Sequence, residues 1–186
     1  DIDAGERVNG TILTVPSGKT VNLNLNGFTI EGTRSGTGNF QLVENSGSLT
    51  IMDSSADERG RLAIDADVDH EWNSLTAVVT NRGSLTLESG SLINLGGTAM
   101  AYCVDNNSTT SSPVLTVNGG KLESTYIAVR QFANSTTYTN DVIVTGGEVK
   151  GATRGLWIQQ PSNGAGAQQA SIAVTGGKVE GGSAAI

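Results

Sequence analysis

The sequence has few of the residues that build the commonest kinds of catalytic or metal site. It contains one cysteine, one histidine and three prolines, and aromatic residues make up only 4% of the chain. A single cysteine, Cys103, has no partner for an internal disulfide, and we interpret it as a small residue within a strand. A single histidine, His70, cannot build a histidine-rich metal centre, and no partnered serine or cysteine is evident for a triad. Disulfide-stapled folds and triad catalysis are therefore disfavoured.

Positive charge and long apolar runs are also scarce. Lysine and arginine number 11 against 18 aspartates and glutamates, which gives a formal net charge of -7. Nucleic-acid phosphates and anionic membrane surfaces both attract basic side chains, so we predict neither as a partner. No apolar run is long enough to cross a bilayer, and no signal peptide is present. We expect the segment to be an excerpt of a longer protein, with targeting and anchoring signals outside it.

Glycine and short alternating strands are abundant instead. The 25 glycines do not fall at every third position, which excludes collagen. Short runs of valine, isoleucine and leucine throughout the chain disfavour disorder. A unit made of an alternating strand, a glycine corner and a second strand recurs along the sequence. Its clearest copies lie at residues 114–123, 142–150 and 172–180, with an earlier version at 85–92.

The spacing of these units predicts the fold. Aligning them places one apolar residue of each unit in a single column: Leu49, Leu85, Leu115, Val142 and Ile172. A period of about 30 residues is typical of a solenoid. The period-two pattern excludes helical repeats, and the antiparallel hairpins of a propeller blade are missing. We predict an all-β parallel β-helix of about six rungs with three short strands each, formed by residues 20–186 after a leading segment or partial rung at 1–19.

The third strand of each rung gives three further columns. We interpret the first as inward: Val43, Val79, Val104, Val129 and Ile158. The next residue in each rung should point outward: Glu44, Thr80, Asp105, Arg130 and Gln159. The one after that should form a buried amide ladder, because amides about 4.8 Å apart can hydrogen-bond along a stack: Asn45, Asn81, Asn106, Gln131 and Gln160. Alternation also predicts an exposed apolar row: Leu42, Val78, Cys103, Ala128 and Trp157.

Loop lengths differ between the corners of the predicted solenoid. Between the second and third strands, the long loops come early, at residues 31–39 and 65–74. Between the third strand and the next first strand they come late, at 107–113, 132–140 and 161–170. Insertions at equivalent corners of a solenoid stack into one ridge, which is often the binding face. We predict that the three late loops form a polar shelf carrying Phe132 and Tyr138.

The outer face of the third strands, together with this shelf, is the candidate binding site. An exposed apolar row beside polar groups is typical of an interaction surface, and tryptophan and arginine are enriched at binding hot spots. The alternative is that loops, or parts of the protein outside this segment, cover the row. The predicted binding residues are Trp157, Arg130, Asp105, Glu44, Gln159, Phe132 and Tyr138.

A metal site and an enzyme are the alternatives to this interpretation. Alternating carboxylates in a loop can bind Ca²⁺, which makes Asp65, Asp67 and Asp69 weak candidates, although the EF-hand pattern is missing and a solvated loop is favoured. No other cofactor is predicted. Polysaccharide hydrolysis needs paired carboxylates at a cleft. The outward column of the first strands holds none: Asn24, Thr50, Thr86, Thr116, Ile143 and Ala173. We therefore predict no catalytic residues and keep a lyase or hydrolase as the minority alternative.

Two stretches carry a resemblance to a known class of proteins. Residues 15–30 (VPSGKTVNLNLNGFTI) and 84–92 (SLTLESGSL) resemble the repeats of large bacterial cell-surface proteins with a pectate-lyase-like right-handed β-helix. The resemblance covers nearly the whole chain. It implies a right-handed solenoid at the cell surface that acts as an adhesin-like module for a host protein or glycan. Some such proteins bind host immunoglobulin as superantigens, and the alternative is a passive stalk.

Overall fold

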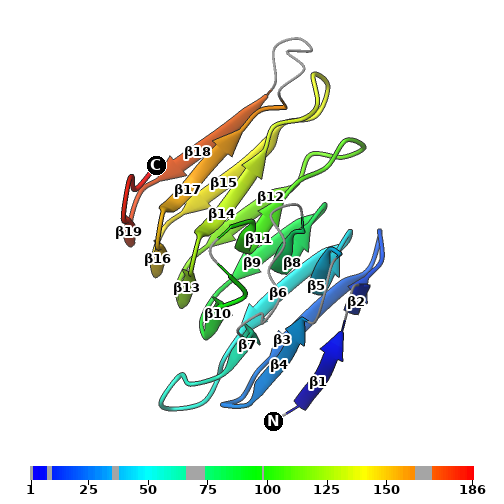
Figure 1. Cartoon of the computed structure of the whole chain (residues 1–186), viewed down its shortest axis with the longest axis vertical. Helices are drawn as coiled ribbons and strands as arrows, with labels where there is room; N and C mark the ends of the chain where they lie inside the picture. The colour runs from blue at the N-terminus through cyan, green and yellow to red at the C-terminus, as the bar shows by residue number, and fades with distance from the viewer. Residues whose placement is uncertain (1, 8–9, 35–37, 66–73, 98, 162–168) are drawn as a thin grey trace.

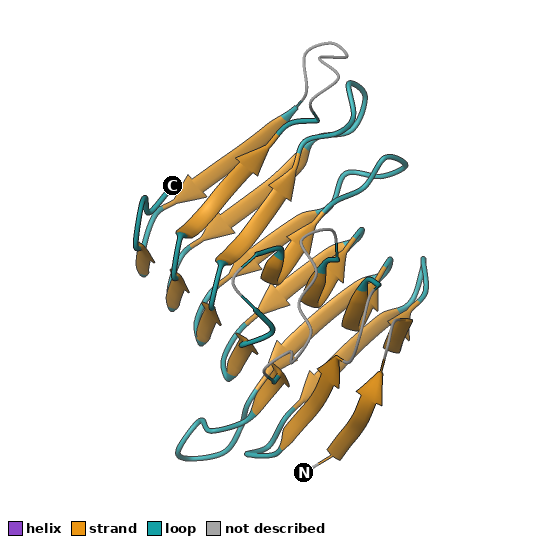
Figure 2. Ribbon diagram, in the orientation of Figure 1, coloured by secondary structure: helices purple, strands orange, loops and turns teal. Residues whose placement is uncertain are grey.

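The computed structural model describes residues 2–7, 10–34, 38–65, 74–97, 99–161 and 169–186, and within these ranges it is all-β (Figures 1 and 2). Its strands form three parallel sheets, and each turn of the chain adds one strand to each sheet. The described residues contain no helix that is long and apolar enough to cross a membrane. The chain is therefore the predicted parallel β-helix with three strands per rung.

The three sheets are the walls of the solenoid. Sheet A contains β1 (Ile2–Arg7), β4 (Thr29–Arg34), β7 (Arg61–Ile64), β10 (Ser91–Asn94), β13 (Lys121–Ser124), β16 (Glu148–Gly151) and β19 (Lys178–Gly181). Sheet B contains β2 (Gly10–Val15), β5 (Phe40–Asn45), β8 (Thr76–Asn81), β11 (Ala101–Asn106), β14 (Ile127–Phe132) and β17 (Arg154–Gln159). Sheet C contains β3 (Thr20–Asn24), β6 (Ser48–Met52), β9 (Ser84–Leu87), β12 (Val114–Val117), β15 (Asn140–Val144) and β18 (Ala170–Val174).

The core is a set of stacked aliphatic columns. Leu85 of β9 pairs with both Leu49 and Leu115, and the column continues through Val142 to Ile172, as the repeat alignment predicts. The first four of these residues are buried. Among the described residues of this core, Phe40 is the one aromatic side chain. Burial of small aliphatic groups, which contributes about 25 cal/mol per Å² of apolar surface, therefore holds successive rungs together.

Sheet B departs from simple alternation, and the predicted exposed apolar row is wrong for four of its five members. Leu42, Val78, Cys103 and Ala128 are all buried in the core, beside the inward residues that follow them. The ladders of sheet B skip these positions: Gln41 pairs with Ala77 and Val43 with Val79, but the intervening pair is missing. The same gap recurs in the later rungs. A local bend at this point turns two consecutive side chains inward, so the outward residue is the one before.

The amide ladder is confirmed for its first members and wrong for its last. Asn45 donates to Asn81 and Asn81 donates to Asn106, both over 2.8 Å between buried side chains. Gln131 is in register with Asn106, but its neighbour in β17 is Ile158. Ile158 was expected beside Val129, a place that Leu156 takes instead. The pairing in sheet A explains this register. Ser124 pairs with Gly151 there, and Val129 and Leu156 lie equally far along the chain from these two residues.

The corner between sheets C and A explains the repeated glycine pairs. Gly120 has a φ of +70°, a left-handed conformation that glycine adopts without a steric penalty. A Cβ on Gly119 would collide with the carbonyl oxygen of Glu88 in the preceding rung. The repeated stretch 114–123 is therefore scaffold, because its glycines allow close stacking of the corners.

The described late loops, 107–113 and 133–139, lie on the same side of the solenoid, as predicted for these two (Figure 1). The loop 133–139 contacts the one that follows β17, since Thr139 Oγ1 donates to Gln169 Oε1 over 2.8 Å and the Gln169 amide donates to Ser135 O over 3.4 Å. Tyr138 lies half-buried in loop 133–139, whereas Phe132 is the last residue of β14. The shelf therefore begins where the outer face of sheet B ends.

Candidate functional site

The outer face of sheet B over β8, β11, β14 and β17 carries two neighbouring columns of side chains. One column runs Ala77, Tyr102, Ile127 and Arg154. The other runs Thr80, Asp105, Arg130 and Trp157. Strands in such a sheet lie about 4.8 Å apart. The bend in sheet B therefore gives this face two outward positions per rung, and large side chains occupy both positions from β14 onward.

Arg130 occupies the centre of this face. Its Nε and one terminal nitrogen each donate a hydrogen bond of 2.7 Å to the two carboxylate oxygens of Asp105. The guanidinium carbon lies 4.8 Å from the ring centroid of Tyr102 and 5.0 Å from that of Phe132. Its remaining terminal nitrogen donates to Gln159 Oε1 over 3.4 Å. Both members of the ion pair are buried, and each of the three guanidinium nitrogens already donates to a neighbouring side chain, so Arg130 organises the face.

The ionisation of this cluster follows from its burial. Burial disfavours the charged guanidinium, but the Asp105 carboxylate outweighs that effect and raises the pKa of Arg130. Burial also raises the pKa of Tyr102 to about 12, against the opposing effect of the Arg130 charge. At neutral pH the face therefore holds a buried ion pair, and the uncharged ring of Tyr102 packs on it.

An aromatic rim surrounds the Arg130 centre. The chain has three phenylalanines, three tyrosines and two tryptophans, and four of these lie on this face: Tyr102, Tyr126, Phe132 and Trp157. The rings of Tyr102 and Tyr126 are 6.1 Å apart and tilted by 54°. Tyr126, Trp157 and Met100 pack, half-buried, on a second apolar cluster of Leu75, Ala77, Tyr102 and Ile127. Residues from the loops before β8 and β11 thus cover the part of the face formed by these two strands. The β14–β17 end is more open, because its side chains on β17 are only half-buried.

Arg154 lies on β17, the half-buried and therefore more open end of the face, and Ala184 forms a parallel bridge beside it. Its guanidinium carbon lies 5.4 Å from the ring centroid of Trp157. Within the part of the chain whose side chains are described, the other arginines each pair with a carboxylate: Arg59 with Asp57, Arg61 with Glu31, Arg82 with Glu44 and Arg130 with Asp105. Arg154 has no such partner among the described residues. It is therefore a cation on an aromatic surface with its charge uncompensated by an ion pair.

The structure brings together five of the seven predicted binding residues. Asp105, Arg130, Gln159, Phe132 and Trp157 form one cluster. The predicted column is correct as far as Arg130, but its next member is Trp157, and Gln159 pairs with Phe132 because of the shifted register of β17.

The other two predicted binding residues lie elsewhere. Glu44 belongs to the same column on β5, where it forms a 3.1 Å ion pair with Arg82. Tyr138 lies in the adjoining loop 133–139. Both are outside the Arg130 cluster.

Sequence reasoning missed several members of this face. Tyr102 was hidden by the bend, because simple alternation places its neighbour Cys103 on the outside. Tyr126 and Met100 come from the turns that precede β14 and β11. A concentration of aromatic residues just before or within the third strands of consecutive rungs is the signal that points to them.

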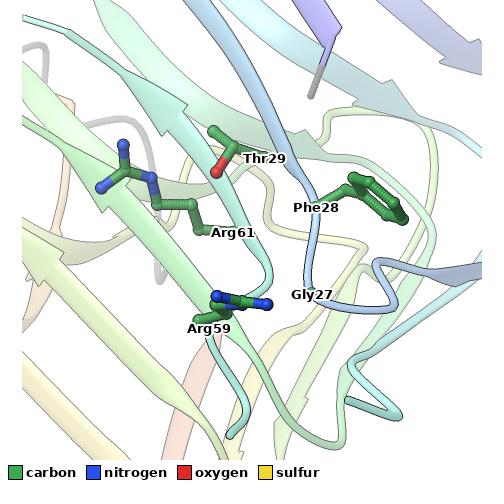
Figure 3. A pocket seen from close by; sticks show the side chains of 5 residues that line it. All are labelled: Gly27, Phe28, Thr29, Arg59 and Arg61. Carbon is green, nitrogen blue, oxygen red and sulfur yellow. The ribbon is translucent and has the colours of Figure 1, made fainter.

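A hollow lies apart from this face, at the corner between β3 and β4 (Figure 3). It is lined by Gly27, Phe28, Thr29, Arg59 and Arg61. Arg59, Arg61 and Thr29 border the hollow, while the exposed ring of Phe28 points away from the two arginines. Arg59 and Arg61 already pair with Asp57 and Glu31, at 3.2 and 3.3 Å. Its positive charge is therefore neutralised locally, and the outer face of sheet B is the stronger candidate.

The described residues considered for the metal and enzyme alternatives lie in sheet C, in β11 and just after β7. Asp65 follows β7, and Asp67 and Asp69 lie outside the described residues. Across the described ranges, no group of three or more histidine, cysteine, aspartate or glutamate side chains could hold a metal ion. In sheet C, Thr50 pairs with Asn22, whereas Asn24 pairs with Met52. The outward column therefore begins at Asn22 and not, as predicted, at Asn24. Burial raises the pKa of the Cys103 thiol, which disfavours its nucleophilic form.

The two columns on sheet B thus provide a preorganised aromatic surface, with Arg154 unpaired by any carboxylate of the described residues. Comparison of the chain with protein-family models, with curated proteins and with solved structures finds no match.

Proposed function

We propose that the chain is a non-catalytic extracellular binding module of a bacterial surface protein, which engages a host protein or glycan through the outer face of β11, β14 and β17. One observation carries the proposal: a chain with very few aromatic residues concentrates Tyr102, Tyr126, Phe132 and Trp157 on one outer face. A core of stacked aliphatic columns has no need of them there. Aromatic residues and arginine are the types most enriched at binding hot spots.

Rigidity of this face supports recognition. A binding surface gains affinity when its side chains are ordered before the partner arrives, because less conformational entropy is lost on binding. The bidentate pair between Arg130 and Asp105 holds the guanidinium in place, and the rings of Tyr102 and Phe132 pack against it. The half-buried rim of Trp157, Tyr126 and Phe132 is therefore presented on a rigid base.

The stacked late loops extend this surface. Phe132 ends β14 and leads directly into loop 133–139, which carries Tyr138. Loops on a rigid scaffold commonly supply adaptable polar contacts at the edge of a binding site. A partner larger than the aromatic rim, such as an immunoglobulin, would touch both the strand face and these loops.

The test is capture of defined host partners by wild-type and variant protein. The informative variant is Tyr126→Ala combined with Trp157→Ala, because both side chains are half-buried on the rim and neither belongs to the Arg130–Asp105 pair. Thr86→Ala combined with Thr116→Ala on sheet C is the matched control, since these outward threonines lie on another wall of the solenoid. Binding to pooled immunoglobulin and to an array of host glycans is measured for each.

We expect wild type and the sheet C control to bind and the rim variant to lose binding. Equal binding by all three would remove this face from consideration. No binding by wild type to either partner class would favour the stalk alternative, and release of products from uronate polymers, with or without Ca²⁺, would favour the enzyme alternative.

A further inference from the structure

We infer that the open end of this face, at Arg154 and Trp157, binds a carboxylated saccharide. Arg154 pairs with the carboxylate, and the aromatic rim takes the apolar face of the sugar ring. This inference depends on the proposed binding function and names the chemical class of its ligand.

Charge is the first argument. The protein is acidic, with a net charge of -7, and its described arginines other than Arg154 are each neutralised by a carboxylate. Lys121, Lys150 and Lys178 on sheet A are likewise paired with glutamates. Arg154 therefore presents positive charge on a surface where the protein itself supplies no counterion among the described residues. A planar guanidinium matches the geometry of a carboxylate through two parallel hydrogen bonds.

The neighbouring Arg130 is poorly placed for this role, because it is buried and its charge is already paired with Asp105. Asp105 accepts two of its hydrogen bonds and Gln159 accepts a third. The rings of Tyr102 and Phe132 lie against the guanidinium. Arg130 is thus a positioning residue, and the unpaired cation one strand further along is the recognition residue.

Aromatic packing is the second argument. Sugar rings present C–H groups on one face, and these pack against aromatic rings, while their hydroxyls need polar partners at the edge. Trp157 and Tyr126 are half-buried and leave part of their rings accessible at this end, and Gln159 on the same strand as Trp157 adds a polar side chain. Arg154 lies over the Trp157 ring at 5.4 Å, so a carboxylate bound to it would hold the attached sugar at the rim.

Size distinguishes a saccharide from a protein as the occupant of this end. A standard protein interface buries about 800 Å² on each partner. The rim residues span three adjacent strands, or about 10 Å at a spacing of about 4.8 Å per strand. That span matches one or two pyranose rings and is much smaller than a protein footprint.

The experiment measures binding of three probes to the full chain by titration calorimetry. The probes are sialyllactose, its methyl ester, in which the carboxylate is masked, and neutral lactose. The variants are Arg154→Gln and Trp157→Ala, and the matched control is Arg82→Gln, an arginine that directly follows β8 of the same sheet and pairs with Glu44. Circular dichroism and thermal melts of each variant confirm that the fold is intact.

We expect wild type and Arg82→Gln to bind sialyllactose at least about tenfold more tightly than the methyl ester or lactose, because a charged hydrogen bond is lost with the ester. Arg154→Gln should remove this preference, and added salt should weaken binding of the carboxylated probe. Equal binding of all three probes, unchanged binding by Arg154→Gln, or no binding of sialyllactose in the millimolar range would overturn the inference.

The same measurements separate this inference from the proposed function. If the Tyr126→Ala and Trp157→Ala double variant loses a host partner that wild type captures, but no carboxylated saccharide binds, the face binds a different ligand class. Treating the captured partner with sialidase gives the same distinction, since capture that survives the treatment indicates an acidic or aromatic protein surface.

Discussion

The Arg130 guanidinium on β14 and the Asp105 carboxylate on β11 are joined by two hydrogen bonds of 2.7 Å on the outside of the β-helix wall. Their strands are neighbours in sheet B, and the two residues are directly in register. Both are buried, although they face away from the main core. The pair therefore anchors a second, smaller packed layer on one wall of the solenoid, and that layer carries the candidate site.

Asp105→Ala should destabilise the fold strongly, because it leaves the Arg130 charge buried without a partner. The expected cost is about 3–5 kcal/mol in the free energy of unfolding, measured by chemical denaturation. Glu44→Ala removes one member of the more exposed pair with Arg82 and should cost about 0–1 kcal/mol. Replacing both buried partners with apolar residues, as Asp105→Leu with Arg130→Met, should cost less than Asp105→Leu alone. Similar losses for Asp105→Ala and Glu44→Ala would contradict the burial of the pair.

The ionisation of Tyr102 should couple stability to high pH. Its pKa is about 12 in the folded chain against an ordinary value of 10.0, so the fold favours the neutral phenol. That contribution is fully present below pH 10 and is lost as the pH rises toward 12. Tyrosinate absorbance followed during a pH titration of the native protein should contain a late step that Tyr102→Phe removes and Tyr138→Phe retains. A late step that persists in Tyr102→Phe would assign it to another group.

Asn81→Ala should interrupt the amide ladder. The Asn81 side chain accepts from Asn45 and donates to Asn106 and to two backbone carbonyls, all in a buried corner. Each group left without a partner costs about 1–3 kcal/mol. Gln160→Ala, at an exposed position outside the ladder, should change the free energy of unfolding by no more than about 0.5 kcal/mol. Equal effects of the two substitutions in denaturation curves would show that the ladder adds no stability.

Gly120→Ala and Gly18→Ala separate backbone strain from rung stacking. Both glycines have positive φ, +70° and +75°, so both substitutions carry the penalty of about 1–2 kcal/mol for a left-handed alanine. A Cβ on Gly18 meets no atom, whereas one on Gly120 would collide with the carbonyl oxygen of Gly90. Gly120→Ala should therefore lower the melting temperature considerably more than Gly18→Ala. Matching decreases would mean that the corners are not closely stacked.

Much of the fold was predictable because the repeat is regular. The column from Leu49 to Ile172 and the first three rungs of the amide ladder follow from alternation and period alone. The bend in sheet B was not predictable in this way, since alternation holds only where a strand is straight, and Tyr102 was hidden as a result. The predicted register of β17 was also wrong. It aligned Ile158 with Val129, whereas the pairing of Gly151 with Ser124 in sheet A places Leu156 beside Val129.

The sequence by itself determined the architecture. Period-two apolar residues, glycine corners and a repeat of about 30 residues are local features, and each is satisfied by the same stacking in every rung. The candidate site was decided by the tertiary structure, because it depends on contacts between residues that lie far apart in the chain. Asp105 and Arg130 were predicted to lie on one outward column, but only the stacked rungs close them into a buried pair. The same stacking places Tyr102 and Phe132 against it and leaves Arg154 at the open end of the face.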